Sequence, residues 1–154
     1  MPPPPFPLPP GATGFFPPHA PLPETDPRTF RTALYTAARA ARGRVDEVED
    51  HVHPRTYRTG TVIHPAGRTV VLGHLHHPWI AFVPERRDAY ADEFLSPPPW
   101  ADVFSAAGFL VLTGDQLSVP LAGEASSGLT PFEWRQAVYH GTATLGGAVF
   151  NTWD

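Results

Sequence analysis

The sequence contains no cysteine, and its 11 basic residues are all arginine. The absence of cysteine excludes disulfide bonds, thiolate nucleophiles and zinc sites built on sulfur, and it fits a reducing compartment. The absence of lysine excludes Schiff-base chemistry and the lysine of a P-loop. Because alanine, glycine and proline are also abundant, the exclusive use of arginine indicates a high-GC bacterial genome.

Long apolar runs are also missing. No stretch approaches the roughly 20 apolar residues that span a bilayer, and the N-terminus has neither the basic nor the apolar region of a signal peptide. We therefore expect a cytoplasmic protein with no membrane partner. The net charge is −4, whereas duplex-binding domains are usually basic, so a nucleic-acid partner is disfavoured.

Proline is abundant at one end of the chain only. Of its 21 prolines, 12 lie within the first 27 residues. Proline fixes φ and lacks a backbone donor, which favours extended chain over helix or sheet. We predict a disordered proline-rich tail over residues 1–25 and a single domain over residues 26–154. The alternative is a strap that docks its phenylalanines on the domain.

The first helix of the domain has clear boundaries. Asp26 is a suitable N-cap, Pro27 suits the first helical position and Gly43 ends the pattern. Apolar residues recur at helical spacing between them. The opposite face carries an arginine stripe, which consists of Arg28, Arg31, Arg39 and Arg42. A stripe of this kind is normally the solvated face of an amphipathic helix, but it is also suited to phosphate or to an acidic partner.

A run of strands follows. Residues 44–52 are ambiguous, and their β-branched residues favour a strand. Residues 56–64 and 69–76 form a hairpin around Gly67, for which we expect His64 to pair with Thr69. Residues 79–83 are apolar on both faces, as in a central strand.

The C-terminal half is mainly helical. A middle helix opens at Pro97–Pro99 and ends at Gly108, and a buried strand covers residues 109–112. Residues 114–121 fit either a hairpin or a capped helix. Thr130 and Glu133 form a capping box that starts a helix running to about Tyr139, and a last helical segment starts at Thr142. The predicted class is α+β, with a small antiparallel sheet of three to five strands flanked by N-terminal, middle and C-terminal helices.

Histidine is the main candidate for chemistry. His74 and His76 lie on one strand face at a spacing that metal sites use. His51 and His53 repeat this spacing, and His64 lies on the other hairpin face. Three such imidazoles with a water would make a hydrolytic zinc centre. No long metalloenzyme motif accompanies them, so structural histidines are the competing interpretation.

The C-terminal aromatic residues are the other candidate. Phe150 and Trp153 lie close to the end of the sequence, where chains usually fray. Either they dock on the domain or they anchor a partner, since tryptophan is a preferred hot-spot residue.

No serine-hydrolase elbow and no glycine-rich phosphate loop is present, and we assign no catalytic residue. The sequence therefore favours a non-enzymatic interaction module, regulatory, adaptor or immunity-like, that binds a protein partner and needs no cofactor. The alternatives are a metal-dependent hydrolase, or another metal-binding protein, that uses the histidines, and anion or RNA binding through the arginine stripe.

Overall fold

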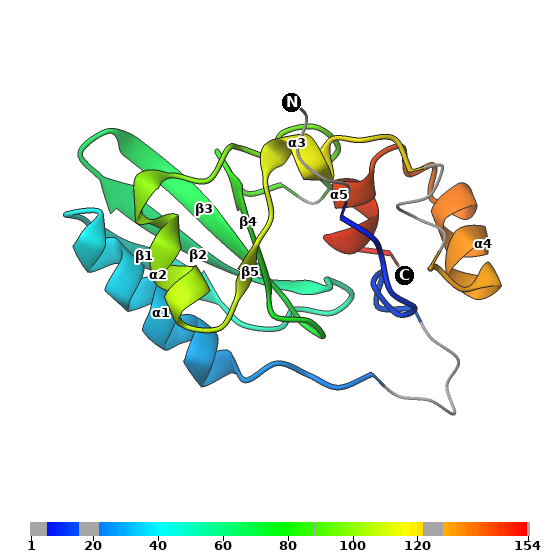
Figure 1. Ribbon diagram of the computed structural model, residues 1–154, viewed down its shortest axis with the longest axis horizontal. Helices are drawn as coiled ribbons and strands as arrows, with labels where there is room; N and C mark the ends of the chain where they lie inside the picture. The colour runs from blue at the N-terminus through cyan, green and yellow to red at the C-terminus, as the bar shows by residue number, and fades with distance from the viewer. Residues whose placement is uncertain (1–5, 16–21, 88, 122–127, 154) are drawn as a thin grey trace.

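A mixed sheet of five strands, in the order β1-β2-β3-β4-β5, forms the centre of the protein, and helices cover it on both sides (Figure 1). The computed structural model describes residues 6–15, 22–87, 89–121 and 128–153. The strands are β1 (Arg44–Glu49), β2 (Tyr57–His64), β3 (Gly67–His74), β4 (Trp79–Val83) and β5 (Leu110–Val111). The helices are α1 (Pro27–Ala40), the 3-10 helix η1 (Pro99–Ala101), α2 (Asp102–Ala106), α3 (Gly114–Leu117), α4 (Pro131–Tyr139) and α5 (Leu145–Val149). The predicted α+β class is confirmed.

Helix α1 begins and packs as its sequence predicts. The Asp26 side chain accepts a hydrogen bond from the Arg28 N–H at 2.8 Å, and Pro27 occupies the first turn. The helix lies so close to the sheet that two glycines are needed beneath it. A Cβ on Gly60 would overlap Leu34, and one on Gly73 would lie 2.6 Å from the Phe30 ring.

The hairpin of β2 and β3 forms, but in a different register from the predicted one. His64 pairs with Gly67, not with Thr69, and Tyr57 pairs with His74. The connection is therefore a two-residue turn, and Gly67 takes the positive φ of 135° just after it. Because side chains alternate with a period of two, a shift of two residues leaves every side chain on its predicted face.

The sheet is antiparallel except at β5. Strand β5 pairs with β4 in parallel, through Leu110 opposite Trp79 and Val111 opposite Ile80. The chain between these strands passes through η1 and α2, and such a crossover is what a parallel neighbour requires. The expectation of a purely antiparallel sheet is corrected at this one pair.

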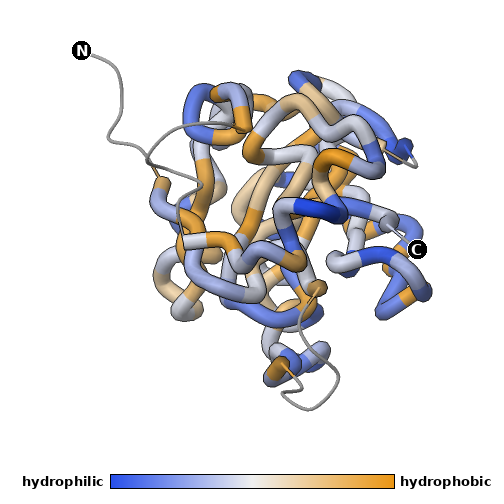
Figure 2. The backbone as a smooth tube through the Cα atoms, turned by 90° about the vertical axis from the view of Figure 1, so that its right-hand side faces the viewer, coloured by the Kyte–Doolittle hydropathy of each residue, from blue (hydrophilic) through white to orange (hydrophobic). Residues whose placement is uncertain are grey.

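Two apolar clusters lie on opposite faces of the sheet. One packs α1 and α2 against Val62, Val71 and Phe82. The other packs α3 and α5, with the C-terminal residues, against Val70 and Leu72. Hydrophobic stretches accordingly run through the central strands of the backbone tube in Figure 2.

Both open secondary-structure predictions are decided by the structure. Residues 44–49 form the edge strand β1, and residues 114–117 form helix α3. The α3 capping box joins the Thr113 side chain to the Gln116 N–H and the Gln116 side chain to the Thr113 N–H. The capping box of Thr130 and Glu133 at the start of α4 is likewise present.

The N-terminal segment, residues 6–15, packs on the domain (Figure 1). Phe6, Leu8, Ala12 and Thr13 are buried. The expectation of a disordered tail over residues 1–25 is thus corrected for this part, because its apolar side chains find a place in the core. Residues 1–5 and 16–21 of that predicted tail lie outside the described residues. In the described parts of the chain, no helix has the length and apolar character of a membrane span.

The close approach of α1 to the sheet leads to a testable expectation for Gly60→Ala. The added methyl group must displace the buried Leu34 side chain, and overpacking of this kind costs about 1–3 kcal/mol. The free energy of unfolding in urea should fall by that amount. Ala66→Ser, at the exposed hairpin turn, is the control and should change it by less than about 0.5 kcal/mol. Equal stability of Gly60→Ala and the wild type would contradict the close packing.

Candidate functional site

His74, the first predicted metal ligand, is buried and uses both ring nitrogens. Its Nε2 lies 3.0 Å from the carbonyl oxygen of Ala12, and its Nδ1 accepts the N–H groups of His76 and His77 at 3.1 and 3.2 Å. The ring is therefore the neutral tautomer protonated on Nε2, with no lone pair left for a metal. Burial, reinforced by the neighbouring His77 and His76, holds the pKa of His74 well below its ordinary value.

The other predicted ligands do not converge on His74. His76 lies beside it, with ring centroids 6.0 Å apart, but its Nδ1 is 2.8 Å from the Pro23 carbonyl oxygen. His51 and His53 are exposed in the connection between β1 and β2. His64 lies at the far end of β2, about 23 Å from the strand end that pairs with His74.

His64 there bonds the Thr69 hydroxyl at 2.9 Å. Among the described residues, no group of three or more His, Cys, Asp or Glu side chains is arranged to hold a metal ion. The structure thus does not bring the predicted zinc ligands together.

Glu133 is the most unusual polar residue of the molecule, and sequence reasoning identified it only as a helix cap. Its side chain is completely buried. Oε1 accepts the N–H groups of Gly11 and Thr130 at 2.8 and 3.1 Å. Oε2 accepts the Thr13 N–H at 3.0 Å and also the Thr13 hydroxyl. The carboxylate therefore joins the start of α4 to the N-terminal segment.

Asn151 completes the attachment of the N-terminal segment, a role for which no sequence pattern was available. Its side-chain amide donates to the carbonyl oxygens of Thr13 at 2.8 Å and Ala148 at 2.6 Å. With Glu133 and His74, three buried polar side chains from distant parts of the chain contact residues 11–13. Each makes hydrogen bonds to the main chain of that turn, and Glu133 also binds the Thr13 side chain.

The two predicted anchor residues at the C-terminus face inward. Phe150 is completely buried and packs edge-on against Tyr57. Trp153 is only 6% exposed, and its ring stacks flat on His140 at a centroid distance of 5.3 Å. The prediction that they anchor a partner is therefore corrected, because both rings are used in the core, as the docking alternative holds.

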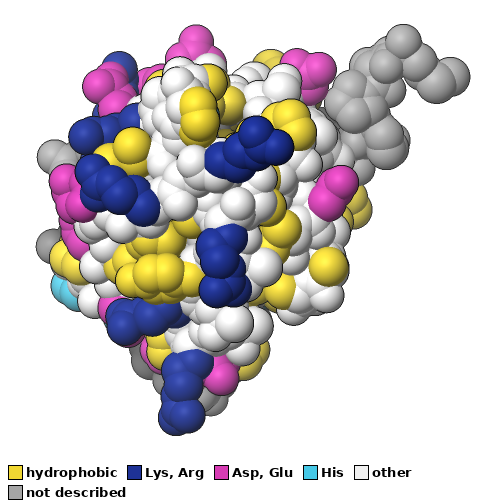
Figure 3. Space-filling view, turned by 90° about the vertical axis from the view of Figure 1, so that its left-hand side faces the viewer, with side chains coloured by type: hydrophobic (Ala, Val, Ile, Leu, Met, Phe, Trp, Pro, Cys, Tyr) yellow, Lys and Arg dark blue, Asp and Glu magenta, His cyan; other side chains and the backbone are white. Residues whose placement is uncertain are grey.

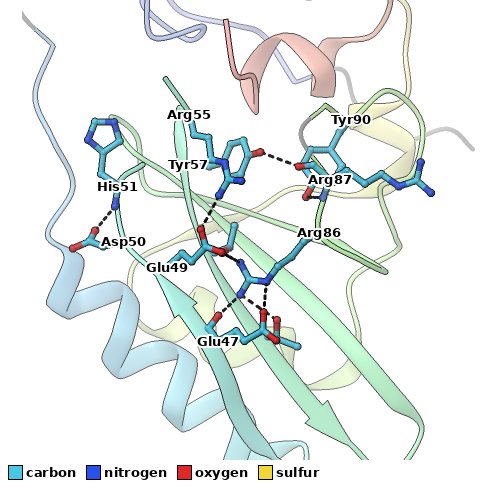
Figure 4. A network of polar contacts seen from close by, with 11 residues as sticks. Glu47, Glu49, Asp50, His51, Arg55, Tyr57, Arg86, Arg87 and Tyr90 are labelled. Atoms are coloured by element: carbon cyan, nitrogen blue, oxygen red, sulfur yellow. Dashed lines mark hydrogen bonds and ion pairs between the residues drawn. The ribbon is translucent and has the colours of Figure 1, made fainter. Parts of the chain in front are cut away.

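Four arginines form a polar network with carboxylates around β1, β2 and the loop after β4, and Figure 4 shows three of them, Arg55, Arg86 and Arg87. Arg86 extends over β1 and β2. Its guanidinium bonds Glu49 and the Thr61 hydroxyl, both at 3.2 Å, and also the Thr59 hydroxyl and the Glu47 carbonyl oxygen. The network thereby covers the hydroxyl groups of β2 at this end of the sheet.

The other three arginines of the network are also paired with carboxylates. Arg55 bonds Glu49 at 2.9 Å, and Arg87 bonds Glu85 at 2.6 Å. Arg58 bonds Asp50 at 2.6 Å, and this bond lowers the pKa of Asp50. These guanidinium groups therefore have structural partners within the chain.

The arginine stripe differs from this network. Arg28, Arg31 and Arg39 are exposed on α1 and Arg42 is exposed just after its C-terminus, and within the described residues none has a carboxylate at ion-pair distance. Tyr35 lies on the same outer face, between Arg31 and Arg39 in sequence, and is 50% exposed. Figure 3 shows basic side chains spread over the α1 side of the molecule with hydrophobic ones between them. The sequence predicted the stripe, and the exposed tyrosine within it was missed.

A shallow apolar groove of about 520 Å³ lies beside the stripe, between α1 and α2. The side chains that line the groove are small and uncharged apart from one arginine. They belong to Arg28, Thr29, Thr32, Ala33, Thr36, Val103, Ala106 and Ala107. A cavity of about 330 Å³ lies elsewhere, near His140 and the C-terminus, and is lined largely by loop residues. The groove is therefore a concave apolar surface beside the arginine stripe.

Comparison of the chain with protein-family models, with curated proteins and with solved structures finds no match.

The buried His74 leads to an expectation about pH. The buried His74 ring stays neutral in the folded protein, whereas the same ring in the unfolded chain binds a proton once the pH falls below its ordinary pKa of 6.5. Its contribution to stability is therefore complete above pH 6.5 and is lost as the pH falls below it, at up to about 1.4 kcal/mol per pH unit. Urea denaturation between pH 7.5 and 5.5 should record this decline.

The matched variants are His74→Gln and His51→Gln. The decline should be shallower in His74→Gln, with a remainder from His77, whose pKa is also lowered by burial. In His51→Gln, which alters an exposed ring, the decline should match the wild type. An unchanged pH dependence in His74→Gln would disprove the assignment.

Proposed function

We propose that this protein is a non-enzymatic interaction module that binds an acidic segment of a protein partner through the outer face of α1, in the cytoplasm. The observation that carries the proposal is the contrast between its arginines. Arg55, Arg58, Arg86 and Arg87 all form ion pairs with carboxylates of the chain, whereas none of the four stripe arginines does so among the described residues. Arg31 acts on the Asp50 carboxylate only through its charge, beyond ion-pair distance.

The composition of this face suits a protein partner. Arginine and tyrosine are among the residues that contribute most to interface energy. The helical part of the stripe runs from Arg28 to Arg39, which at 1.5 Å per residue is about 17 Å, and Arg42 follows just after the helix ends. Unpaired guanidinium groups bind carboxylates in bidentate fashion, so that an acidic segment of similar length would find matching charge along the whole stripe.

The groove between α1 and α2 adds an apolar component. Ala33, Val103 and Ala107 line it, and the threonines of α1 contribute methyl groups. Apolar side chains of the partner would enter this groove while its carboxylates meet the stripe. A surface that combines apolar contact with complementary charge favours a partner protein over nucleic acid, and the net charge of −4 favours it further.

The buried polar side chains support the non-enzymatic interpretation. His74, Glu133 and Asn151 are the residues whose types and burial most resemble catalytic groups. All three make hydrogen bonds to the N-terminal segment, and their other hydrogen bonds are to the main chain of neighbouring elements. This use explains their burial without a reaction.

The test uses an acidic peptide of about 15 residues with glutamate and leucine at helical spacing, and a control peptide with lysine in place of glutamate. The isotope-labelled protein should bind only the acidic peptide, with chemical-shift changes on α1 and α2. Arg31→Glu with Arg39→Glu should weaken binding by roughly tenfold or more, because each exposed ion pair contributes about 0.2–1 kcal/mol and reversal adds repulsion.

The control variant is Arg135→Glu, which changes an exposed arginine on α4 and should leave binding unchanged. Equal weakening in this variant would show that only overall charge matters. Tighter binding of a single-stranded RNA than of the acidic peptide would replace the protein partner by nucleic acid.

A further inference from the structure

The N-terminal segment packs on an apolar surface on the sheet face opposite α1. Phe6 packs edge-on against Trp79, with ring centroids 5.0 Å apart and planes at 89°. Leu8 is buried in the same cluster, and its backbone approaches Gly128 so closely that a Cβ there would overlap it. Residues 6–15 form no strand or α-helix. Phe6 and Leu8 are held by the packing of their buried side chains.

Polar contacts then fix the turn at residues 11–13. The Glu133 carboxylate takes two N–H groups and the Thr13 hydroxyl, Asn151 donates to the Thr13 carbonyl, and His74 donates to the Ala12 carbonyl. Hydrogen bonds to the main chain, with pockets for particular side chains, are how domains recognise short extended peptides. The segment thus occupies the domain as a bound peptide would.

We propose that the surface formed by Trp79, His74, Glu133 and Asn151 is a peptide-binding groove that is specific for residues 6–15 and that accepts this segment from a second copy of the chain. The proposal concerns the face opposite α1 and is independent of the acidic partner.

A second copy fits the groove because the contacts are the same. When an identical segment is exchanged between two chains, every contact is regained, so the exchange costs little beyond the entropy of association. Pro23 and Thr25 are held on the domain by His76 and by the Leu75 carbonyl oxygen, so the segment is joined to α1 through residues 16–22, seven residues that reach about 24 Å when extended. Prolines at positions 7, 9 and 10 restrict the free segment and reduce the entropy lost on docking.

The segment of the same chain has the advantage at low concentration. A short tether gives an effective concentration in the millimolar range, so a single wild-type chain fills its own groove. Exchange of the segment between two chains becomes measurable when a substitution weakens either the segment or the groove of a chain, but not both. The chain offers two substitutions that do so separately.

Thr13→Ala weakens the docking of the segment, because it removes the hydroxyl group that donates a hydrogen bond to Glu133. The substitution leaves the groove intact. Glu133→Gln weakens the binding of the segment by the groove, because an NH2 group replaces the carboxylate oxygen that accepts the N–H and the hydroxyl of Thr13. Glutamine preserves the capping box with Thr130, so α4 keeps its start. Loss of a hydrogen bond to a charged group weakens docking by roughly ten- to a hundredfold.

The experiment mixes the two full-length variants and measures their mass in solution by light scattering after size exclusion. The groove of the Thr13→Ala chain should accept the intact segment of the Glu133→Gln chain. The expected result is a one-to-one species of twice the 16.8 kDa of one chain, while each variant alone stays at the mass of a single chain.

Three results would overturn the proposal. The first is a mixture that stays at the mass of one chain up to about 1 mM, the scale of the tethered concentration. The second is a dimer that either variant forms equally well alone, since this would need no complementary groove and segment. The third is loss of hydrogen-exchange protection throughout the sheet in either variant, which would make residues 6–15 part of the core and not a ligand of it.

Discussion

The carboxylate of Glu133 has no contact with water and no arginine at ion-pair distance within the described structure, yet it accepts four hydrogen bonds. A buried charge is costly unless donors surround it. Three of these donors come from Gly11 and Thr13, so the N-terminal segment must be in place for this carboxylate to be tolerated. The C-terminal half of the molecule therefore depends on residues that precede the first helix. His74 and Asn151 add to the same dependence from β3 and the C-terminus.

The two faces of the sheet are covered in different ways. On one face, α1 and α2 cover an apolar cluster and turn unpaired arginines outward. On the other, short helices and loops cover the sheet, and the N-terminal segment fills the space between them. Short helices of four or five residues contribute little stability of their own. This second face is consequently held by its apolar cluster and by specific polar contacts more than by regular secondary structure.

Features that local chemistry determines could be predicted from the sequence. The cap of Asp26 and Pro27, the capping box of Thr130 and Glu133, and the alternation along β2 and β3 fixed the positions of their elements, because each depends on neighbours within a few residues. The hairpin register was predicted with an error of two residues, since alternation is unchanged by that shift and only the turn distinguishes the two registers. The parallel placement of β5 depends on how the chain crosses over after β4, which no local pattern encodes.

Predictions about the site were less successful for a related reason. The arginine stripe was visible because helical periodicity places its members on one face. The partners of His74, Glu133 and Asn151 lie 62, 120 and 138 residues away in sequence, and a single sequence contains no signal for such pairs. The spacing of His74 and His76 suggested a metal, whereas the nearest donors turned out to be backbone N–H groups. Phe150 and Trp153 looked exposed only because they are near the end of the sequence.

The backbone of Glu47 has a consequence for how this protein meets other molecules. Its positive φ of 47° interrupts the pairing of β1 with β2, and its carbonyl oxygen is bonded by Arg86. At the opposite edge, β5 consists of two residues only. An incoming chain would find no long, regular row of backbone donors and acceptors at either border, which is how natural sheets resist fibril growth. Association by strand addition is thereby disfavoured.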